Sequence, residues 1–337
     1  MKKLSIKKLS EFLGKIVDNN IDASLMIWGA PGIGKSSVVE KVAETRNLEL
    51  IDLRISQLAP TDLRGIPVPA NDKAYWYPPE FLPTEGKGIL FLDEINMAPP
   101  TLQGIAQQLV LDRRVGNYEI PEGWLVWAAG NRKEDRASVF DMPAPLANRF
   151  LHFEVQIDFD SFRSWAIQNN IHEQILAFLA FRPDLLHKPN PSQPAWPSPR
   201  SWEMASKLHD AKLSLAPAVG KGVEGEFTAF IKVYNEVPDL DKIIEGNGQK
   251  IKFSKDPSTR YAVTFGLSVR AIQTEKITNA LQWLLDKADP EWIQLFIHNI
   301  LDRAVATNKL GTIANIIKAN PRIKDFIQSY RETLLAA

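Results

Sequence analysis

The sequence contains no cysteine, and this absence excludes several kinds of chemistry. A chain without cysteine has no disulfide, no thiolate nucleophile and no zinc site with cysteine ligands. Histidine is almost as scarce, with five in the chain. They are scattered, and none falls in a metal-binding spacing such as H-E-x-x-H. We therefore interpret the histidines as ordinary surface or core residues.

The sequence also lacks an excess of either charge and any long hydrophobic run. Lysine and arginine total 40, and aspartate and glutamate total 40, so nothing in the overall charge indicates binding to nucleic acid or to an anionic membrane. No run is long enough to span a bilayer. Near the N-terminus, helical spacing among charges is shown by Leu9, Phe12, Leu13, Ile16 and Val17, which predicts an amphipathic helix rather than a targeting segment. We expect a soluble cytoplasmic protein.

The first half of the chain has the pattern of an α/β domain. Five short apolar runs alternate with helix-like or loop segments, at 24–28, 48–53, 88–93, 124–129 and 151–155. Continuous apolarity is typical of parallel strands that are buried on both faces. Because such sheets bind ligands at the carboxyl ends of their strands, the residues that follow each run are the candidates for function.

A phosphate-binding loop follows the first run. The pattern G-x-x-x-x-G-K-S lies between the predicted strand and a helix-like segment. The candidate binding residues are Gly29, Ala30, Pro31, Gly32, Ile33, Gly34, Lys35, Ser36 and Ser37. Backbone N–H groups of such a loop surround phosphate oxygens, Lys35 is expected to contact the β and γ phosphates, and Ser36 to bind Mg²⁺. The alternative is a glycine-rich turn without a ligand.

Polar residues also follow the later runs. Asp93 and Glu94 end the third run, where one carboxylate can hold hydrated Mg²⁺ and the next can activate a water molecule, although acidic residues also cap helices. Asn131 follows the fourth run and is either a water-orienting amide or a turn residue. Arg149 precedes the fifth run and is either a surface charge or an arginine that reaches a neighbouring subunit's γ phosphate.

This ordered set resembles the AAA+ ATPases, with Walker A at 29–36, Walker B at 93–94, sensor 1 at Asn131 and an arginine finger at Arg149. Three further motifs resemble the dynein-related MoxR branch of that superfamily, at 60–67, 96–100 and 198–200. The resemblance is dense over residues 24–155. It implies that Arg200 is the sensor 2 residue of a lid domain, whereas an ordinary surface arginine at a helix start is the alternative.

The resemblance also implies the architecture. We expect a P-loop NTPase core with a five-stranded parallel sheet in the order 5-1-4-3-2, so that the strand before Asn131 lies between those before Lys35 and Glu94. This core would occupy residues 1–170. A proline-rich linker and an all-α lid would occupy residues 171–337, with residues 250–253 as the one segment there that could form a strand. The family assembles as a ring, usually a hexamer.

Two insertions fit the same branch. Residues 65–83 carry five prolines around Tyr75, Trp76 and Tyr77, which predicts a hairpin that faces a ring pore or a client, or else a plain surface loop. Residues 111–123 predict a second hairpin before the sensor 1 strand. Its arginines Arg113 and Arg114 either reach across a subunit interface or are solvated.

The sequence therefore predicts an Mg²⁺-dependent ATPase of the MoxR type that remodels a protein client. Similar proteins activate metal- or cofactor-containing enzymes with a partner that carries a von Willebrand factor A domain, and that partner would be a separate chain here. One alternative is a nucleic-acid motor of the helicase or restriction-subunit type. Another is a nucleotide-gated scaffold with negligible turnover, which the presence of Glu94 disfavours.

Overall fold

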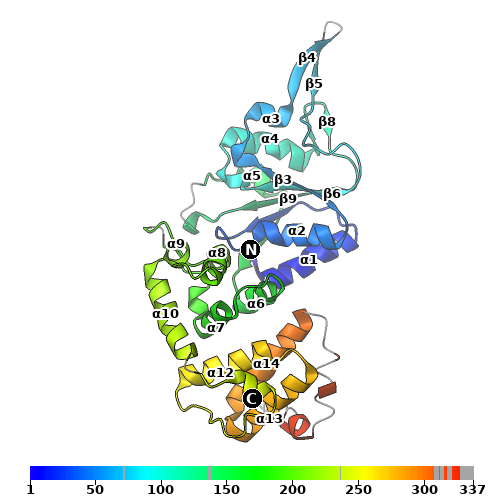
Figure 1. Cartoon of the computed structure of the whole chain (residues 1–337). Helices are drawn as coiled ribbons and strands as arrows, with labels where there is room; N and C mark the ends of the chain where they lie inside the picture. Colours follow the sequence, from blue (N-terminus) through cyan, green and yellow to red (C-terminus); the bar gives the residue numbers. More distant parts are fainter. Residues whose placement is uncertain are drawn as a thin grey trace. The chain divides into compact units, whose positions relative to one another are not determined.

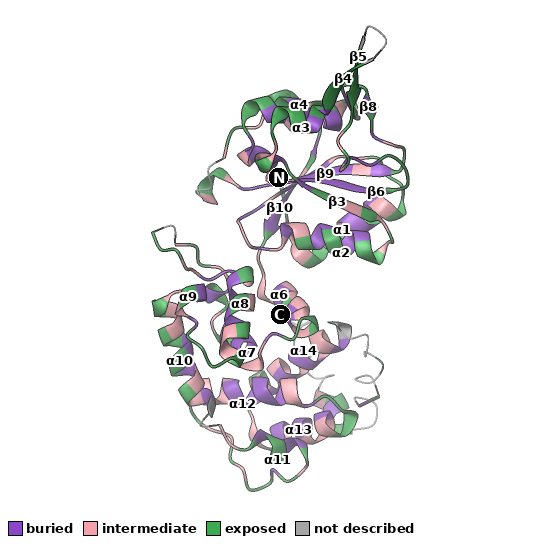
Figure 2. Ribbon diagram, turned by 45° about the horizontal axis from the view of Figure 1, so that its top comes forward, coloured by how far each residue is buried: buried purple, intermediate pink, exposed green. Residues whose placement is uncertain are grey.

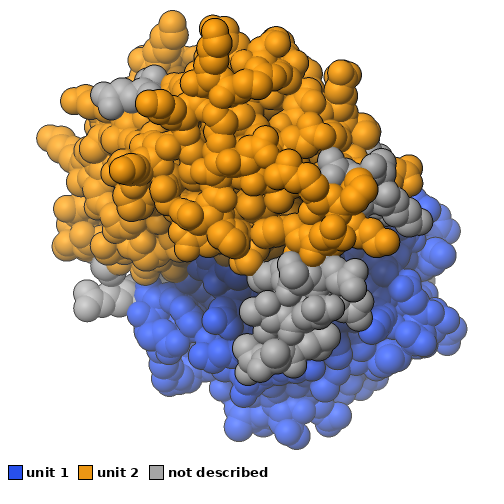
Figure 3. Space-filling model, turned by 90° about the horizontal axis from the view of Figure 1, so that it is seen from below, with its two compact units in different colours: residues 1–158 blue, residues 159–337 orange. Residues whose placement is uncertain are grey.

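The computed structural model describes residues 1–70, 73–135, 139–190, 192–235, 237–306, 311, 315–316 and 321–326. The chain divides into two compact units, residues 1–158 and 159–337, which Figure 3 shows in different colours. The sequence placed this boundary at residue 170. The boundary lies earlier because helix α6 (Phe159–Gln168) packs against α7 (Glu173–Phe181) and α14 (Pro290–Ala306) of the second unit.

A six-stranded parallel sheet forms the centre of the first unit (Figure 1). Its strands are β1 (Lys2–Ser5), β2 (Leu25–Trp28), β3 (Glu49–Arg54), β6 (Gly88–Asp93), β9 (Trp124–Gly130) and β10 (Leu151–Gln156). The order is β1-β10-β2-β9-β6-β3, so the five predicted strands and their order 5-1-4-3-2 are confirmed. The edge strand β1 was missed, since four residues that begin with two lysines carry no apolar run.

Successive side chains of the strands enter two separate cores, as the alternation of a pleated strand requires. On β2, Leu25 and Ile27 pack into one core and Met26 into the other. β6 and β9 divide their side chains in the same way, which explains why their sequences are apolar at every position except Asp93 at the end of β6. Figure 2 shows β6 and β9 as mainly buried.

Helices cover both faces of this sheet (Figure 1). α1 (Ile6–Asp18) and α2 (Lys35–Thr45) pack together on one face, and α1 occupies the segment that the sequence predicted as an amphipathic helix. The other face carries α3 (Pro60–Arg64), α4 (Pro100–Leu111) and α5 (Ala144–Ala147). Short 3₁₀ turns follow three of the strands, namely η1 (Ile55–Gln57), η2 (Ile95–Met97) and η3 (Lys133–Asp135).

Shortening a buried side chain of α1 is expected to destabilise this unit. Leu13 is completely buried in the core beneath α1, so Leu13→Ala should lower the free energy of unfolding by about 2 to 5 kcal/mol. Hydrogen exchange of the amides in β2 and β9 would measure the loss within this unit. The exposed change Lys15→Ala on the same helix is the control, and equal exchange rates in both variants would contradict the expectation.

Two antiparallel hairpins leave the sheet. β4 (Ile66–Ala70) pairs with β5 (Lys73–Tyr77), and this hairpin projects from the unit with exposed Ile66, Tyr75 and Tyr77 (Figures 1 and 2). β7 (Arg114–Val115) pairs with β8 (Tyr118–Glu119). Arg113 at the base of this second hairpin donates to the carbonyls of Pro121 and Trp124 at 3.1 and 2.8 Å. The Arg113 guanidinium therefore binds the segment after the hairpin within its own chain.

The second unit is helical in its described residues. After α6 and α7 come η4 (Pro183–Leu185), α8 (Pro199–Asp210), α9 (Ala216–Val219), α10 (Lys221–Asn235), α11 (Leu240–Ile244), α12 (Pro257–Arg270), α13 (Thr274–Lys287) and α14. The possible strand at 250–253 is wrong, because this segment has no regular structure and Lys287 Nζ donates to its Ile251 carbonyl at 2.6 Å. Among the described residues, no helix is both long and apolar enough to cross a membrane.

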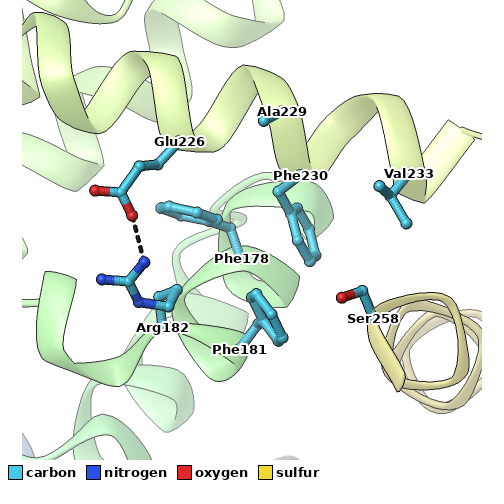
Figure 4. A pocket seen from close by; sticks show the side chains of 8 residues that line it. All are labelled: Phe178, Phe181, Arg182, Glu226, Ala229, Phe230, Val233 and Ser258. Carbon is cyan, nitrogen blue, oxygen red and sulfur yellow. Dashed lines mark hydrogen bonds and ion pairs between the residues drawn. The ribbon is translucent and has the colours of Figure 1, made fainter. Parts of the chain in front are cut away.

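An apolar pocket of about 290 Å³ lies between α7, α10 and α12 of this unit (Figure 4). Phe178, Phe181 and Phe230 turn their rings into it, and Arg182 forms an ion pair with Glu226 at its rim. Its lining contains none of the candidate functional residues.

Candidate functional site

The loop between β2 and α2 brings its lysine into a buried position. Gly34 has φ +96°, a left-handed conformation that side chains rarely adopt, and α2 begins directly after it. Lys35 is 9% exposed, and its Nζ donates to the carbonyls of Gly29 at 2.7 Å and Ala30 at 3.0 Å. The same Nζ donates to Asn131 Oδ1 at 2.9 Å. A buried ammonium at a helix N-terminus, beside glycine-rich backbone, suits a phosphate group.

The next residue of the loop meets the end of β6. Ser36 Oγ donates to Asp93 Oδ2 at 2.9 Å. A hydroxyl and a carboxylate are the hard oxygen donors that Mg²⁺ prefers, and Mg²⁺ usually keeps several water ligands beside one or two such groups. The donor set therefore fits Mg²⁺, which Ser36 and Asp93 would hold between them.

Glu94 begins the turn after β6 with an unusual backbone. Its φ of +53° lies in the left-handed region, and its N–H binds Asp93 Oδ1 at 2.8 Å. Its Oε2 accepts a hydrogen bond from Ser56 Oγ at 3.0 Å. Ser56 lies in η1, directly after β3, so two neighbouring strands of the sheet hold this carboxylate at their carboxyl ends.

Asn131 reaches Lys35 because β9 lies between β2 and β6. The residue directly follows β9 and is 6% exposed. Both polar groups of its backbone bind the carboxamide of Asn96. Asn96 Nδ2 donates to Asn131 O at 2.7 Å, and Asn96 Oδ1 accepts from Asn131 N at 3.1 Å. The sheet thus gathers an ammonium, a hydroxyl, two carboxylates and an amide at one edge.

A charged network lies beside this group. Arg132 donates to both carboxylate oxygens of Asp135 and to Glu154 of β10. The hydrogen bond with Asp135, ahead of that with Glu154, raises the pKa of the Arg132 guanidinium further above its ordinary value. This arginine is therefore always charged, and its bonds connect the segment after β9 to β10.

Arg149 lies apart from this buried group. It follows α5, is exposed, and its guanidinium has no hydrogen bond or ion pair to any described residue. The segment before it is fixed by His152, whose Nε2 binds the Ala147 carbonyl at 2.7 Å while its Nδ1 accepts from Trp28 Nε1 at 2.9 Å. His152 therefore connects β2, the strand before the phosphate loop, to the segment before Arg149. With these two partners the imidazole is neutral and protonated on Nε2.

Arg200 belongs to the second unit. It is exposed in the first turn of α8, which Ser198 caps by accepting from Ser201 N at 3.1 Å. Its guanidinium has no hydrogen bond or ion pair to the described part of the chain. Because the helix is capped directly before Arg200, the backbone of this residue is fixed at the surface of its unit.

Sequence reasoning missed Ser56, Asn96 and His152. Ser56 carried a usable signal, because it follows the second apolar run and thus lies at the same edge of the sheet as the other site residues. Asn96 lay inside a family motif that gave it no task. His152 was interpreted as an ordinary residue, since one histidine inside a strand reveals neither of its partners.

Part of the chain is similar to known proteins. Residues 24–150 match the AAA domain of the dynein-related subfamily. Midasin of Giardia intestinalis is 25% identical over 154 residues, which cover 43% of this chain but 3% of that much longer protein.

Similar solved structures include a RuvB mutant of Thermotoga maritima, with 15% identity and a TM-score of 0.42 over 77% of this chain and 81% of that chain. They also include a putative ATPase of Cytophaga hutchinsonii, with 15% identity and a TM-score of 0.35 over 93% and 88% of the two chains.

Proposed function

We propose that this chain, whose residues 24–150 are an AAA domain and hence an ATPase domain of the AAA+ superfamily, hydrolyses ATP with Mg²⁺ within a ring of identical subunits. The observation that carries the proposal is the meeting of four side chains at one sheet edge. Lys35 binds Asn131, and Ser36 binds Asp93, although these partners come from segments far apart in the sequence.

Each of these residues has a task that its geometry supports. Lys35 and the backbone N–H groups of residues 29–37 other than Pro31 bind the triphosphate. Ser36 and Asp93 would hold Mg²⁺, which would neutralise phosphate charge. Glu94 accepts a proton from the attacking water, and the carboxamide of Asn131 orients that water. Lys35 and Asn131 already contact each other, so the charge and the amide are aligned before the reaction.

The exposed Arg149 supports a ring. A guanidinium that has no partner within the described part of its own chain is free to reach the site of the next subunit. An arginine supplied in this way stabilises the charge that develops on the transferred phosphoryl group. Arg200 of the lid senses the nucleotide in the same proposal, and its exposure at the start of α8 is compatible with that task.

The work of such a ring would be the remodelling of a protein client in the cytoplasm, as in the MoxR branch. The motifs at 60–67, 96–100 and 198–200 support this branch, and the exposed aromatic hairpin β4–β5 offers a contact surface for a client. The client is proposed to be a metal- or cofactor-containing enzyme, recruited with a separate partner that carries a von Willebrand factor A domain. Equal numbers of acidic and basic residues favour a protein client over nucleic acid.

The test is the ATPase rate per subunit as the protein concentration rises, with particle mass recorded with and without ATP. We expect the rate per subunit to rise and the mass to shift to that of a ring when ATP is present, because each site needs the neighbour's Arg149. Lys35→Ala, which removes the phosphate-binding charge, is the control and should show neither change.

Two outcomes would contradict the proposal. A monomer whose rate per subunit is independent of concentration would exclude catalysis between subunits. A salt-sensitive affinity for DNA that stimulates turnover would instead indicate a nucleic-acid motor, because phosphate contacts weaken as salt rises.

A further inference from the structure

The buried side chain of Asn96 makes two hydrogen bonds to the backbone of one residue, Asn131. Asn96 lies in η2, two positions after Glu94, and is 3% exposed. Its Nδ2 donates a hydrogen bond to Asn131 O at 2.7 Å, and its Oδ1 accepts one from Asn131 N at 3.1 Å. A primary amide has the donor and acceptor of a peptide group, so the side chain of Asn96 binds Asn131 as a neighbouring strand would.

The sheet explains why a side chain is needed there. The backbone ladder between β6 and β9 ends with the pair Leu92 and Ala128. Beyond that pair the chain turns away through Glu94, whose left-handed backbone begins η2. The N–H and C=O of Asn131 would be buried without partners, and Asn96 supplies both.

The packing is also tight at the preceding residue, where any side chain would force its neighbours to move. A Cβ added to Gly130 would lie 2.5 Å from Asn96 Oδ1 and 2.6 Å from Met26 Cε. Gly130 is also tied to the phosphate loop, because its carbonyl accepts from Gly29 N at 3.2 Å. The main chain that carries Asn131 is therefore held from β2 on one side and from Asn96 on the other.

We infer that Asn96 is a positioning residue for ATP hydrolysis, which fixes the carboxamide of Asn131 against Lys35 by holding the Asn131 backbone. The inference rests on the proposed function. It connects the segment of Glu94 rigidly to the segment of Asn131, so that the proposed proton acceptor and the proposed water-orienting amide keep one separation. Residues that orient a functional group in this way typically contribute ten- to a hundredfold to activity.

The test is Asn96→Asp, made in the wild-type chain and in an Asn131→Ala chain. A carboxylate keeps the bond from Asn131 N but turns an oxygen toward the Asn131 carbonyl, which should displace that segment. In the wild-type chain we expect a ten- to hundredfold loss of kcat with little change in ATP affinity. In the Asn131→Ala chain, where no carboxamide remains to be positioned, the same change should cost almost no further kcat, while both chains lose thermal stability equally.

Gln103→Glu is the matched control. Gln103 is a completely buried amide of α4 whose Nε2 donates to Ala98 O at 3.0 Å, so it makes the same chemical exchange without contact to Asn131. It should lower thermal stability and leave kcat unchanged. If Asn96→Asp does not fold, Gly130→Ala displaces the Asn96 amide by its added methyl group and should show the same dependence on Asn131.

The outcomes separate the inference from the function beneath it. An equal kcat loss from Asn96→Asp in both chains, or no loss in the wild-type chain, overturns the positioning task. The absence of ATP turnover in the wild-type chain overturns the proposed hydrolysis itself, whereas full turnover by Asn131→Ala overturns the task of the carboxamide that Asn96 is inferred to position. Single-turnover release of phosphate from ATP resolves the low rates that the double variant requires.

Discussion

Replacing Glu94 by glutamine is expected to lower ATP turnover about 10² to 10⁴-fold while ATP binding stays near wild type. The amide keeps the shape of the carboxylate and the acceptor for Ser56 Oγ, so the turn after β6 should persist. It cannot accept a proton from water, however. The residues that bind phosphate, Lys35 and Ser36, are unchanged, and the ring should therefore assemble with ATP and hold it.

Phosphate release and the equilibrium binding of a fluorescent ATP analogue would measure the two effects separately. Glu122→Gln makes the same exchange at an exposed position and should leave both quantities unchanged. Wild-type turnover in Glu94→Gln would show that another group accepts the proton, and the assignment of Glu94 would have to be withdrawn.

Replacing Arg149 by alanine is expected to lower turnover about 10³-fold or more, again with ATP binding retained. The side chain is exposed and has no hydrogen bond or ion pair to a described residue of its own chain, so the fold should not depend on it. Arg322→Ala, which removes an exposed arginine of the second unit that pairs with Asp286, is the control and should leave ATP turnover near wild type.

Mixing the two inactive variants gives a sharper result. An Arg149→Ala subunit still carries Glu94, and a Glu94→Gln subunit still carries Arg149, so mixed rings contain some complete sites. We expect ATP turnover in the mixture to exceed that of either variant alone. A mixture as inactive as its components would argue that Arg149 acts within its own subunit or has no part in the reaction.

The positions of five strands and the meeting of the site residues followed from the sequence because both depend on long, simple patterns, whereas the strand order was implied by the family resemblance. Five apolar runs marked the strands, and parallel strands bring their carboxyl ends to one edge, which placed Asp93 and Asn131 near Lys35. The edge strand β1 has only one buried side chain, Leu4, and carries no such pattern.

Pairings of single polar residues could not be predicted. The bonds of Asn96 with Asn131 and of His152 with Trp28 join positions that are 35 and 124 residues apart in the sequence. Which partner a buried amide or imidazole finds depends on the exact path of two turns, and that path is set by tertiary packing rather than by local sequence.

The prolines of the β4–β5 hairpin limit edge-to-edge pairing between hairpins of different molecules. Pro67 and Pro69 lie two positions apart on β4, opposite Trp76 and Ala74, and both lack an N–H group. The outer edge of β4 therefore cannot donate hydrogen bonds at these positions to a strand of another molecule. The hairpin can expose its aromatic side chains at high local concentration while its backbone resists polymerisation into a continuous sheet.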